Sequence, residues 1–181
     1  MTPIETLKHE HKIIMLVLEI AGEEENSIRK SGIVDFNKIR EIIEFSKNFT
    51  DGCHHAKEER YLFPKLCEKG FSRDTGPIAV MLKEHREGRK FVQQITDNML
   101  LSLKGNVHAI ADLADSLSRY FVLLESHINK ENNILFVMAN KALTDEDNIK
   151  LSEAFEKIDS EEIGEGEFEL FHKIANRLSG K

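Results

Sequence analysis

The chain has 181 residues, of which 40% are hydrophobic and 31% are charged, and its formal net charge is −7. This length and composition indicate a globular domain with a sizeable core, and a negative chain without a Lys/Arg run argues against a nucleic-acid or anionic-membrane partner. Only 3 Pro and 10 Gly interrupt the sequence, which favours long helices over a many-stranded sheet.

The N-terminus and the cysteines predict a cytoplasmic protein. Residues 1–5 lack the basic segment, apolar stretch and cleavage site of a secretion signal, and the apolar run at 13–20 is too short to span a membrane. Cys53 and Cys67 lie on one expected helix, whose rise separates them by about 21 Å. They therefore cannot pair with each other, and free thiols are typical of a reducing compartment.

The first two helices are read from their start and stop signals. Residues 2–5, Thr-Pro-Ile-Glu, form a capping box with Pro at the first helical position, and the helix is expected to end at Gly32. A second helix is expected over about 35–69, with Gly70 as its stop. Pro64 is expected to kink this helix or to end its regular part early.

The next two helices complete a predicted bundle. A third helix opens at residues 75–77, Thr-Gly-Pro, and continues to about Leu103, and a fourth runs over about 108–143. Short connections place successive helices antiparallel. Residues 1–143 are therefore expected to form an up-down-up-down four-helix bundle.

Residues 144–181 are predicted to be a short C-terminal helical extension packed on the bundle. A second capping box at 144–147 opens a fifth helix through Ile158, and two glycines then separate off a last helix over about 167–178. No stretch of the chain alternates with the period of two that is typical of strands. The predicted fold class is all-α.

Four of the eight histidines are expected at one level of the bundle. His11 precedes Gly32, the glycine between the first two helices, by almost the same stretch of chain as His54 follows it. His85 and His127 stand in the same relation to Gly105, between the last two long helices. Because a helix rises about 1.5 Å per residue, the mismatches are only a few ångströms. A single histidine is more often a surface or core residue, but scattered histidines have no reason to match in height.

A repeat strengthens this interpretation. Residues 54–63 and 127–136 share the pattern His-x-x-Lys-Glu-x-x-x-Leu-Phe. The Glu-His pairs at 10–11 and 84–85 echo each other at almost the same separation along the chain. The two halves therefore look like a pseudo-twofold repeat, in which one helix supplies a His and the next supplies His-x-x-x-Glu.

The spacing of these residues predicts a dinuclear metal site. Glu58 and Glu131 each stand one helical turn after a histidine, which places imidazole and carboxylate on the same helix face. Imidazole suits iron, zinc, copper and nickel, and a carboxylate can bridge two ions. Without metal, each buried carboxylate would cost on the order of several kcal/mol. The six predicted ligands are His11, His54, Glu58, His85, His127 and Glu131.

These motifs resemble the hemerythrin-like family, in the branch of HHE cation-binding domains. The matching stretches are residues 10–11, 53–64, 82–85 and 127–136, and the resemblance covers about 1–143. The resemblance implies two iron ions, bridged by the two glutamates. Zinc and other divalent metals are alternatives, because such ligand sets accept them readily.

The resemblance also implies how the histidines divide between the ions. His11 and His54 would serve one ion, and His85 and His127 the other. The oxygen-carrying members have a further histidine one helical turn before the one that matches His85, and here that position is Met81. A missing imidazole leaves an open or water-filled position, which favours chemistry at the metal over reversible storage of dioxygen.

Several neighbours of the predicted ligands stay open. His55 and Glu59 lie one residue further round the helix, where they either touch the metal or face away from it. Tyr61 and Tyr120 lie two turns from a predicted ligand, as core aromatics or as part of a cavity lining. His9 is expected at the surface.

The leading functional hypothesis is a di-iron protein that binds or reacts with dioxygen, peroxide or nitric oxide. The alternative is a non-catalytic iron or oxygen sensor or storage protein that acts through metal-dependent stability or a partner contact. A ferritin-like carboxylate site needs Glu-x-x-His on two helices, and only Glu169 and His172 fit. The absence of His-Glu-x-x-His argues against a metalloprotease.

Overall fold

The computed structural model describes residues 1–163, and within this part every regular element is a helix. The predicted all-α class is therefore confirmed for the described residues. The last short helix, predicted over about 167–178, lies outside them.

Helix α1 (Pro3–Ser31) begins and ends where the sequence predicts. The backbone N–H of Glu5 donates to the Thr2 hydroxyl at 3.2 Å, and the Glu5 carboxylate accepts from the Thr2 N–H at 2.7 Å. At the other end Gly32 has φ 68°, a left-handed conformation that glycine adopts without steric strain. The capping box and the terminal glycine thus fix the length of α1.

Each of the four long helical stretches of the fold is here called a rod, and the second rod, residues 36–68, is less regular than predicted. Wider π-helical turns make up residues 46–55, which include the histidine pair at 54–55, and residues 58–62, so the predicted helix over about 35–69 is continuous but not regular throughout. Pro64 stands in the first turn of the helix that follows and has no backbone N–H to donate to a carbonyl one turn earlier, which disfavours a regular α-helical hydrogen-bond pattern there. The rod consists of α2 (Phe36–Phe45), η1 (Ser46–His55), η2 (Glu58–Leu62) and α3 (Phe63–Glu68).

The remaining elements follow the predicted order. Helix α4 (Gly76–Leu103) is regular and forms the third rod, and the fourth rod, over residues 108–142, again contains a π-helical segment, which begins at Glu131. Such segments are rare and occur often at functional sites. The other elements are α5 (His108–Lys130), η3 (Glu131–Leu135), α6 (Phe136–Ala142), α7 (Asp145–Lys157) and η4 (Ile158–Ile163).

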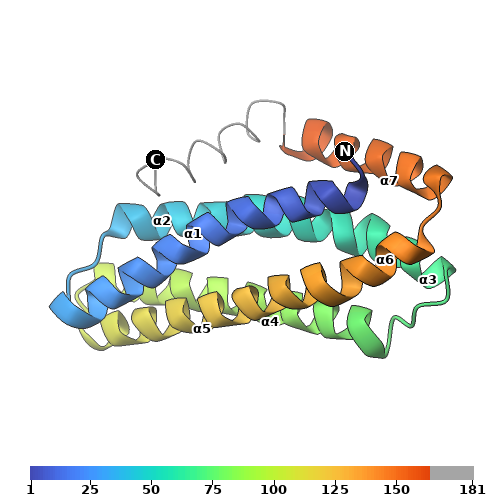
Figure 1. The fold of residues 1–181 in the computed structure, drawn as a ribbon. Coiled ribbons are helices and arrows are strands. Elements are labelled where there is room, and N and C mark those ends of the chain that lie inside the picture. The colour runs from blue at the N-terminus through green and yellow to red at the C-terminus, as the bar shows by residue number, and fades with distance from the viewer. Residues whose placement is uncertain (164–181) are drawn as a thin grey trace.

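Figure 1 shows α1, the second rod, α4 and the fourth rod lying side by side, with successive rods running in opposite directions. Helix α5 packs against both α1 and α4, and η1 packs against α4. The capped helix α7 turns back over the bundle, where it contacts α1 and η2, while η4 contacts η1.

The apolar core is divided into two clusters. Along α1, Leu7 belongs to one cluster and Ile14 to the other, and the buried polar residues Glu10 and His11 stand between them. Buried charged and histidine side chains occupy the same level on the other rods. A polar layer thus crosses the middle of an otherwise apolar interior.

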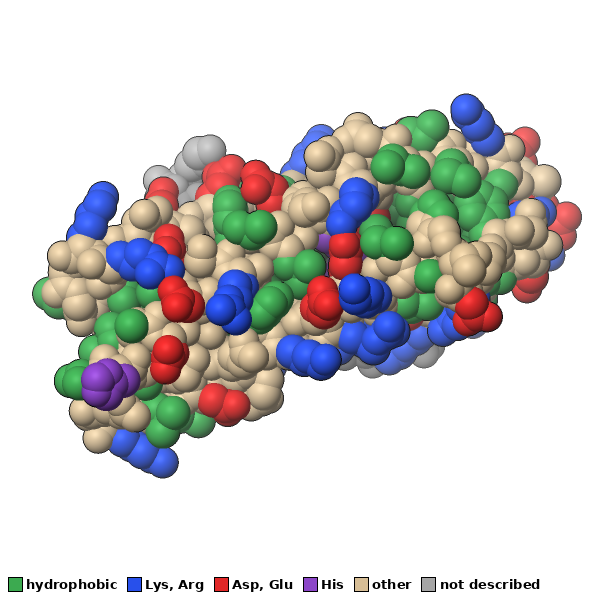
Figure 2. Space-filling view, turned by 90° about the horizontal axis from the view of Figure 1, so that it is seen from below, with side chains coloured by type: hydrophobic (Ala, Val, Ile, Leu, Met, Phe, Trp, Pro, Cys, Tyr) green, Lys and Arg blue, Asp and Glu red, His purple; other side chains and the backbone are tan. Residues whose placement is uncertain are grey.

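The surface carries charges of both signs. On the face shown in Figure 2, Lys and Arg side chains are interspersed with Asp and Glu. Over residues 1–163, no helix combines the length and apolar character needed to cross a membrane.

Candidate metal centre

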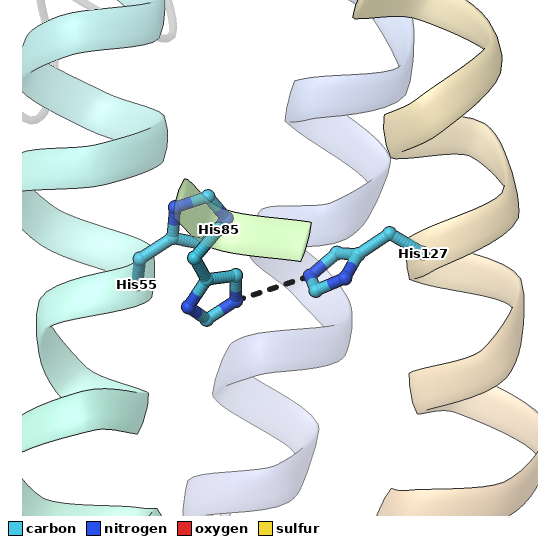
Figure 3. A group of neighbouring side chains, drawn as sticks. All are labelled: His55, His85 and His127. Atoms are coloured by element: carbon cyan, nitrogen blue, oxygen red, sulfur yellow. Dashed lines mark hydrogen bonds between the residues drawn. The ribbon is translucent and has the colours of Figure 1, made fainter. Parts of the chain in front are cut away.

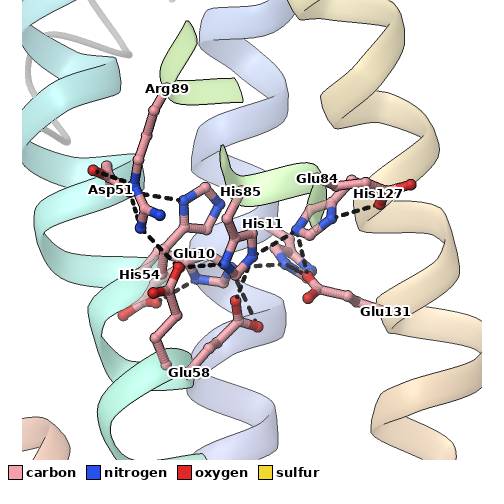
Figure 4. A network of polar contacts seen from close by, with 12 residues as sticks. Glu10, His11, Asp51, His54, Glu58, Glu84, His85, Arg89, His127 and Glu131 are labelled. Carbon is pink, nitrogen blue, oxygen red and sulfur yellow. Dashed lines mark hydrogen bonds and ion pairs between the residues drawn. The ribbon is translucent and has the colours of Figure 1, made fainter. Parts of the chain in front are cut away.

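The four predicted histidine ligands come from four different rods and converge at the polar layer (Figure 4). Nε2 of His11 lies 3.0 Å from Nε2 of His54. Nε2 of His85 lies 3.2 Å from Nε2 of His127. All four side chains are buried. The structure therefore brings together, in pairs, the histidines that the matched heights indicated.

The two predicted carboxylates connect these pairs. The Glu131 carboxylate lies 3.1 Å from Nε2 of His11 and 3.3 Å from Nε2 of His127. The Glu58 carboxylate lies 3.8 Å from Nε2 of His54 and 3.3 Å from Nε2 of His85. Two groups of metal-binding side chains result, and both contain Glu58 and Glu131. One carboxylate therefore reaches from each histidine pair to the other.

The outward nitrogens of the histidines fix which nitrogen faces the centre. Each Nδ1 lies within hydrogen-bond distance of an oxygen that only accepts, which places the proton on Nδ1 and leaves a lone pair on Nε2. Three acceptors are carboxylates and one is an amide oxygen. The pairs are His54–Glu10 at 2.8 Å, His85–Glu59 at 2.8 Å, His127–Glu84 at 3.0 Å and His11–Asn132 at 3.0 Å.

The donor set fits a cation. Both carboxylate oxygens of Glu58 and one of Glu131 are buried without a hydrogen-bond partner. They face four Nε2 lone pairs, and lone pairs at such distances repel each other unless a positive charge stands between them. Imidazole nitrogens with carboxylate oxygens suit iron and zinc.

Burial shifts the pKa values of these groups, and it holds the histidines in the neutral form that binds metal. Burial, followed by neighbouring histidines, lowers the pKa of His54 and of His85 well below the usual value, so both imidazoles are held neutral. Burial and the Glu131 charge raise the pKa of Glu58 well above its usual value. Burial alone would raise the pKa of Glu131, but His127 and His11 outweigh it and lower that pKa.

Sequence reasoning missed two carboxylate–lysine pairs behind the histidines. Glu10 contacts both His54 and Lys57, and burial raises the pKa of Glu10 to about 6. Glu84 contacts both His127 and Lys130 in the same way. The signal was present in the repeat, because its Glu-His pairs and its His-x-x-Lys segments contain all four residues. The pattern did not reveal that a Glu from one helix would form hydrogen bonds and ion pairs with the His and Lys of the next.

One of these pairs extends to the C-terminal part of the described chain. Lys57 is fully buried, and its Nζ lies 2.6 Å from a carboxylate oxygen of Asp159 in η4. Burial would lower the pKa of Lys57, but its interactions with Glu10, Cys53 and Asp159 together outweigh burial and raise it. Cys53 Sγ donates to Asp159 at 3.3 Å, and burial raises the pKa of this thiol. Asp159 thus joins η4 to the residues that orient His54.

The sequence did not decide whether His55 faces the metal centre, and the structure places it beside the centre (Figure 3). Its ring stacks on the His85 ring, with centroids 3.8 Å apart and an interplanar angle of 19°. One ring nitrogen lies within 4.8 Å of a ring nitrogen of His85 and of His127. An imidazole binds metal in its own ring plane, so nearly parallel stacking prevents His55 and His85 from sharing one ion in this arrangement. Glu59 bonds Nδ1 of His85 and so supports a predicted ligand.

The other residues singled out in the sequence have simpler surroundings. Tyr120 is buried, and burial raises its pKa to about 12. Tyr61 is half-buried and packs against both apolar clusters. Met81 is buried in the same cluster as Leu7, which stands at the matching position of the repeat. His9 is exposed, as predicted.

Both cysteines are free thiols, as predicted. Cys53 is buried, and Cys67 is half-buried near the end of the second rod.

Comparison with known proteins gives a family match for most of the chain. The model of the hemerythrin HHE cation binding domain matches residues 2–139. This range contains all six predicted ligands and ends before the capping box of α7. No solved structure matches the chain.

The relatives are distant. An uncharacterized protein of Mycobacterium tuberculosis, Rv1995, is 23% identical over 176 residues, which cover 97% of this chain and 68% of that protein. The iron-sulfur cluster repair protein DnrN of Neisseria gonorrhoeae is 36% identical over 91 residues, or 46% of this chain and 54% of that protein. The iron-sulfur cluster repair protein YtfE of Edwardsiella ictaluri is 37% identical over 89 residues, or 48% of this chain and 40% of that protein.

Proposed function

This chain belongs to the hemerythrin HHE cation-binding family, and from that premise we propose that it holds two iron ions and binds or reacts with a small oxidant. The oxidant is dioxygen, peroxide or nitric oxide. The proposal takes the four rods as an up-down-up-down bundle of the hemerythrin type, with residues 144–163 as an extension on its surface.

The observation that carries the proposal is the sharing of two carboxylates between two histidine pairs. His11 and His54 form one group with Glu58 and Glu131, and His85 and His127 form a second group with the same two glutamates. A site for one metal ion would need only one of these two groups of ligands. Two ions held by the histidine pairs, with Glu58 and Glu131 as ligands common to both, would give the inward-facing lone pairs a positive charge to bind.

Different residues around the site would orient the ligands and exclude water. Glu10, Glu59 and Glu84 orient the imidazoles through their Nδ1 atoms, and this orientation is worth about 10–100-fold in metal affinity at comparable sites. The two apolar clusters above and below keep bulk water from the ligands. When bound, an iron pair supplies electrons to a small oxidant. Four imidazoles instead of the five of the oxygen carriers leave a position for that molecule, and we propose it at the ion of His85 and His127.

The alternative is a protein whose iron serves another protein, as a sensor, as a store or in the iron-sulfur cluster repair that two relatives are named for. The contact that favours it is the link from His54 through Glu10 and Lys57 to Asp159. Through this link, metal binding at His54 would affect how η4 packs on the bundle.

An anaerobic iron titration tests the proposal. Iron analysis of the desalted protein should saturate at about two ions per chain, as expected for a two-metal site, and the optical spectrum should change when air, peroxide or nitric oxide is added. Glu131→Gln should lose iron, while Glu125→Gln, on the exposed face of α5, should not. Saturation at one ion, or an oxidised spectrum that no oxidant alters, contradicts the proposal.

A further inference from the structure

We propose that small molecules reach the metal pair from one side of the bundle, through a cavity between η1, α4 and α5 whose inner end is His55. The ligands are small molecules that iron binds, such as dioxygen, peroxide, nitric oxide or azide. This inference rests on the proposed function and adds to it the route by which the oxidant arrives.

The cavity extends from the surface to His55, the neighbour of the predicted ligand His85. It has a volume of about 200 Å³, which is ample for molecules of this size. Its outer lining includes the exposed residues Lys47 and Gln93, and its inner lining includes the buried residues Gly88 and His55. Because His55 stacks on His85 and brings a nitrogen within 4.8 Å of the His85 and His127 nitrogens, the inner end adjoins the second metal group.

The two halves of the repeat differ in the residues at this cavity. When the two halves are superposed on their shared motifs, Gly88 corresponds to Ile14, and His55 corresponds to Ile128. Both isoleucines are buried in the apolar cluster. The side chains that would fill the space are thus present between α1 and α5 and replaced between η1 and α4.

The opposite side has a groove of its own, and its position argues against access there. This groove, of about 440 Å³, is lined in part by Met15, Ile128 and Asn132. It also touches His11, whose Nδ1 bonds Asn132. The groove therefore meets the outward edge of His11, and the imidazole itself stands between the groove and the lone pair that faces the centre.

Arg89 stands at the cavity and holds the residues around its inner end. Its guanidinium lies 2.8 and 3.0 Å from the two carboxylate oxygens of Asp51 and 2.7 Å from Glu59. Asp51 accepts from Nδ1 of His55 at 3.2 Å, and Glu59 bonds His85. One exposed side chain thus ties η1, η2 and α4 together and keeps the inner lining in place.

Gly88 offers a way to narrow the cavity without disturbing the fold. A Cβ added there would meet Leu123, Leu124 and Tyr120 at 3.9 Å, which is ordinary contact. Ala in place of a mid-helix Gly also favours the helix. Gly88→Ala is therefore expected to fold, and Gly88→Leu extends a larger side chain into the same space. Thr50→Leu narrows the cavity from η1 and introduces the residue type found at the matching position, Leu123.

The experiment measures azide binding to the oxidised, iron-loaded protein by stopped-flow absorption. Gly88→Leu and Thr50→Leu should each slow azide association about tenfold, or about 1.4 kcal/mol in the barrier, with Gly88→Ala in between and iron content unchanged. Two controls should leave the rate unchanged. Met15→Phe fills the opposite groove, and Gly22→Leu adds the same side chain to α1, where a Cβ meets only Phe121 at 3.9 Å.

Azide rates that are equal in all variants would overturn the proposal, as would slowing by Met15→Phe but not by the cavity variants. An iron-loaded protein that takes up no azide would overturn it too. The same measurement on Co²⁺-loaded protein separates this inference from the proposed function. A chain that fails to retain iron, yet shows the expected rates with Co²⁺, contradicts the di-iron function and supports the route.

Discussion

The two halves of the repeat carry the same inner ligands but differ in what lies behind them. In the first half Lys57 is fully buried beneath η4 and pairs with both Glu10 and Asp159. In the second half the matching Lys130 is a third exposed and pairs with Glu84. Under the proposed function, the inner residues repeat because each of the two ions needs the same coordination chemistry. The outer residues differ, so the histidines of the two halves are held in place by different contacts.

The largest effect is expected when a carboxylate shared by both halves is removed. Glu58→Gln replaces one carboxylate oxygen by an NH2 group that donates hydrogens toward the histidines, so one ion would lose a ligand and the site would lose a negative charge. Retention of iron against a chelator should fall by more than about 100-fold, beyond the range for residues that only orient ligands. Glu59→Gln, one position along the chain, should lose about 10–100-fold because it only orients His85. The reverse order would show that the carboxylate roles are misassigned.

Removal of metal should destabilise the whole bundle. Metal bound only by the folded state adds about 2.7 kcal/mol of stability when free metal is about 100 times Kd. For a chain of this size that corresponds to about 5–10 °C in Tm. Differential scanning calorimetry of the iron-loaded and chelator-treated protein measures the difference. Equal Tm values would mean that the six ligands hold no metal in the folded chain.

The two orienting glutamates allow the halves to be compared directly. Glu84→Gln weakens the support of His127, and Glu10→Gln weakens that of His54 and also leaves the buried Lys57 with one carboxylate fewer. Both variants should lose about 10–100-fold in iron affinity. Only Glu10→Gln should also lower the Tm of the metal-free protein, by about 3 °C or more, which corresponds to about 1 kcal/mol. Similar losses of Tm in both would show that burial of Lys57 makes no difference.

The smallest expected effect tests the link to η4. Asp159→Asn removes one of the two carboxylates on buried Lys57, and because Asp159 is itself partly exposed the loss should be about 1–2 kcal/mol in unfolding free energy. Asp115→Asn breaks an exposed pair with Arg29 and should cost less than about 1 kcal/mol. Urea unfolding measures both. A loss no larger for Asp159 than for Asp115 would remove the proposed coupling between η4 and the first half.

The sequence predicted the parts of this molecule that depend on local rules. The starts of α1 and α7 follow from capping boxes, and the ends of the first three rods follow from glycines that adopt positive φ. The convergence of the six predicted ligands followed from helical rise, because height along a straight helix depends only on residue number. These inferences need no knowledge of side-chain contacts.

The rest depends on packing between helices, which residue number does not determine. The π-helical turns of η1 change the direction in which its side chains point, so the face of His55 was not predictable from the regular period of an α-helix. The contact of Asp159 with Lys57 joins residues far apart in the chain and depends on how α7 turns back. Long-range contacts of this kind cannot be predicted from the spacing of residues along the chain.

The central claim is that two ions share Glu58 and Glu131, and a crystal structure of the iron-loaded protein with anomalous diffraction at the iron edge tests it most directly. We expect two iron peaks, one beside His11 and His54 and one beside His85 and His127, with both carboxylates between them. A single peak, or iron at the Glu10–Cys53–Asp159 group, would contradict the account.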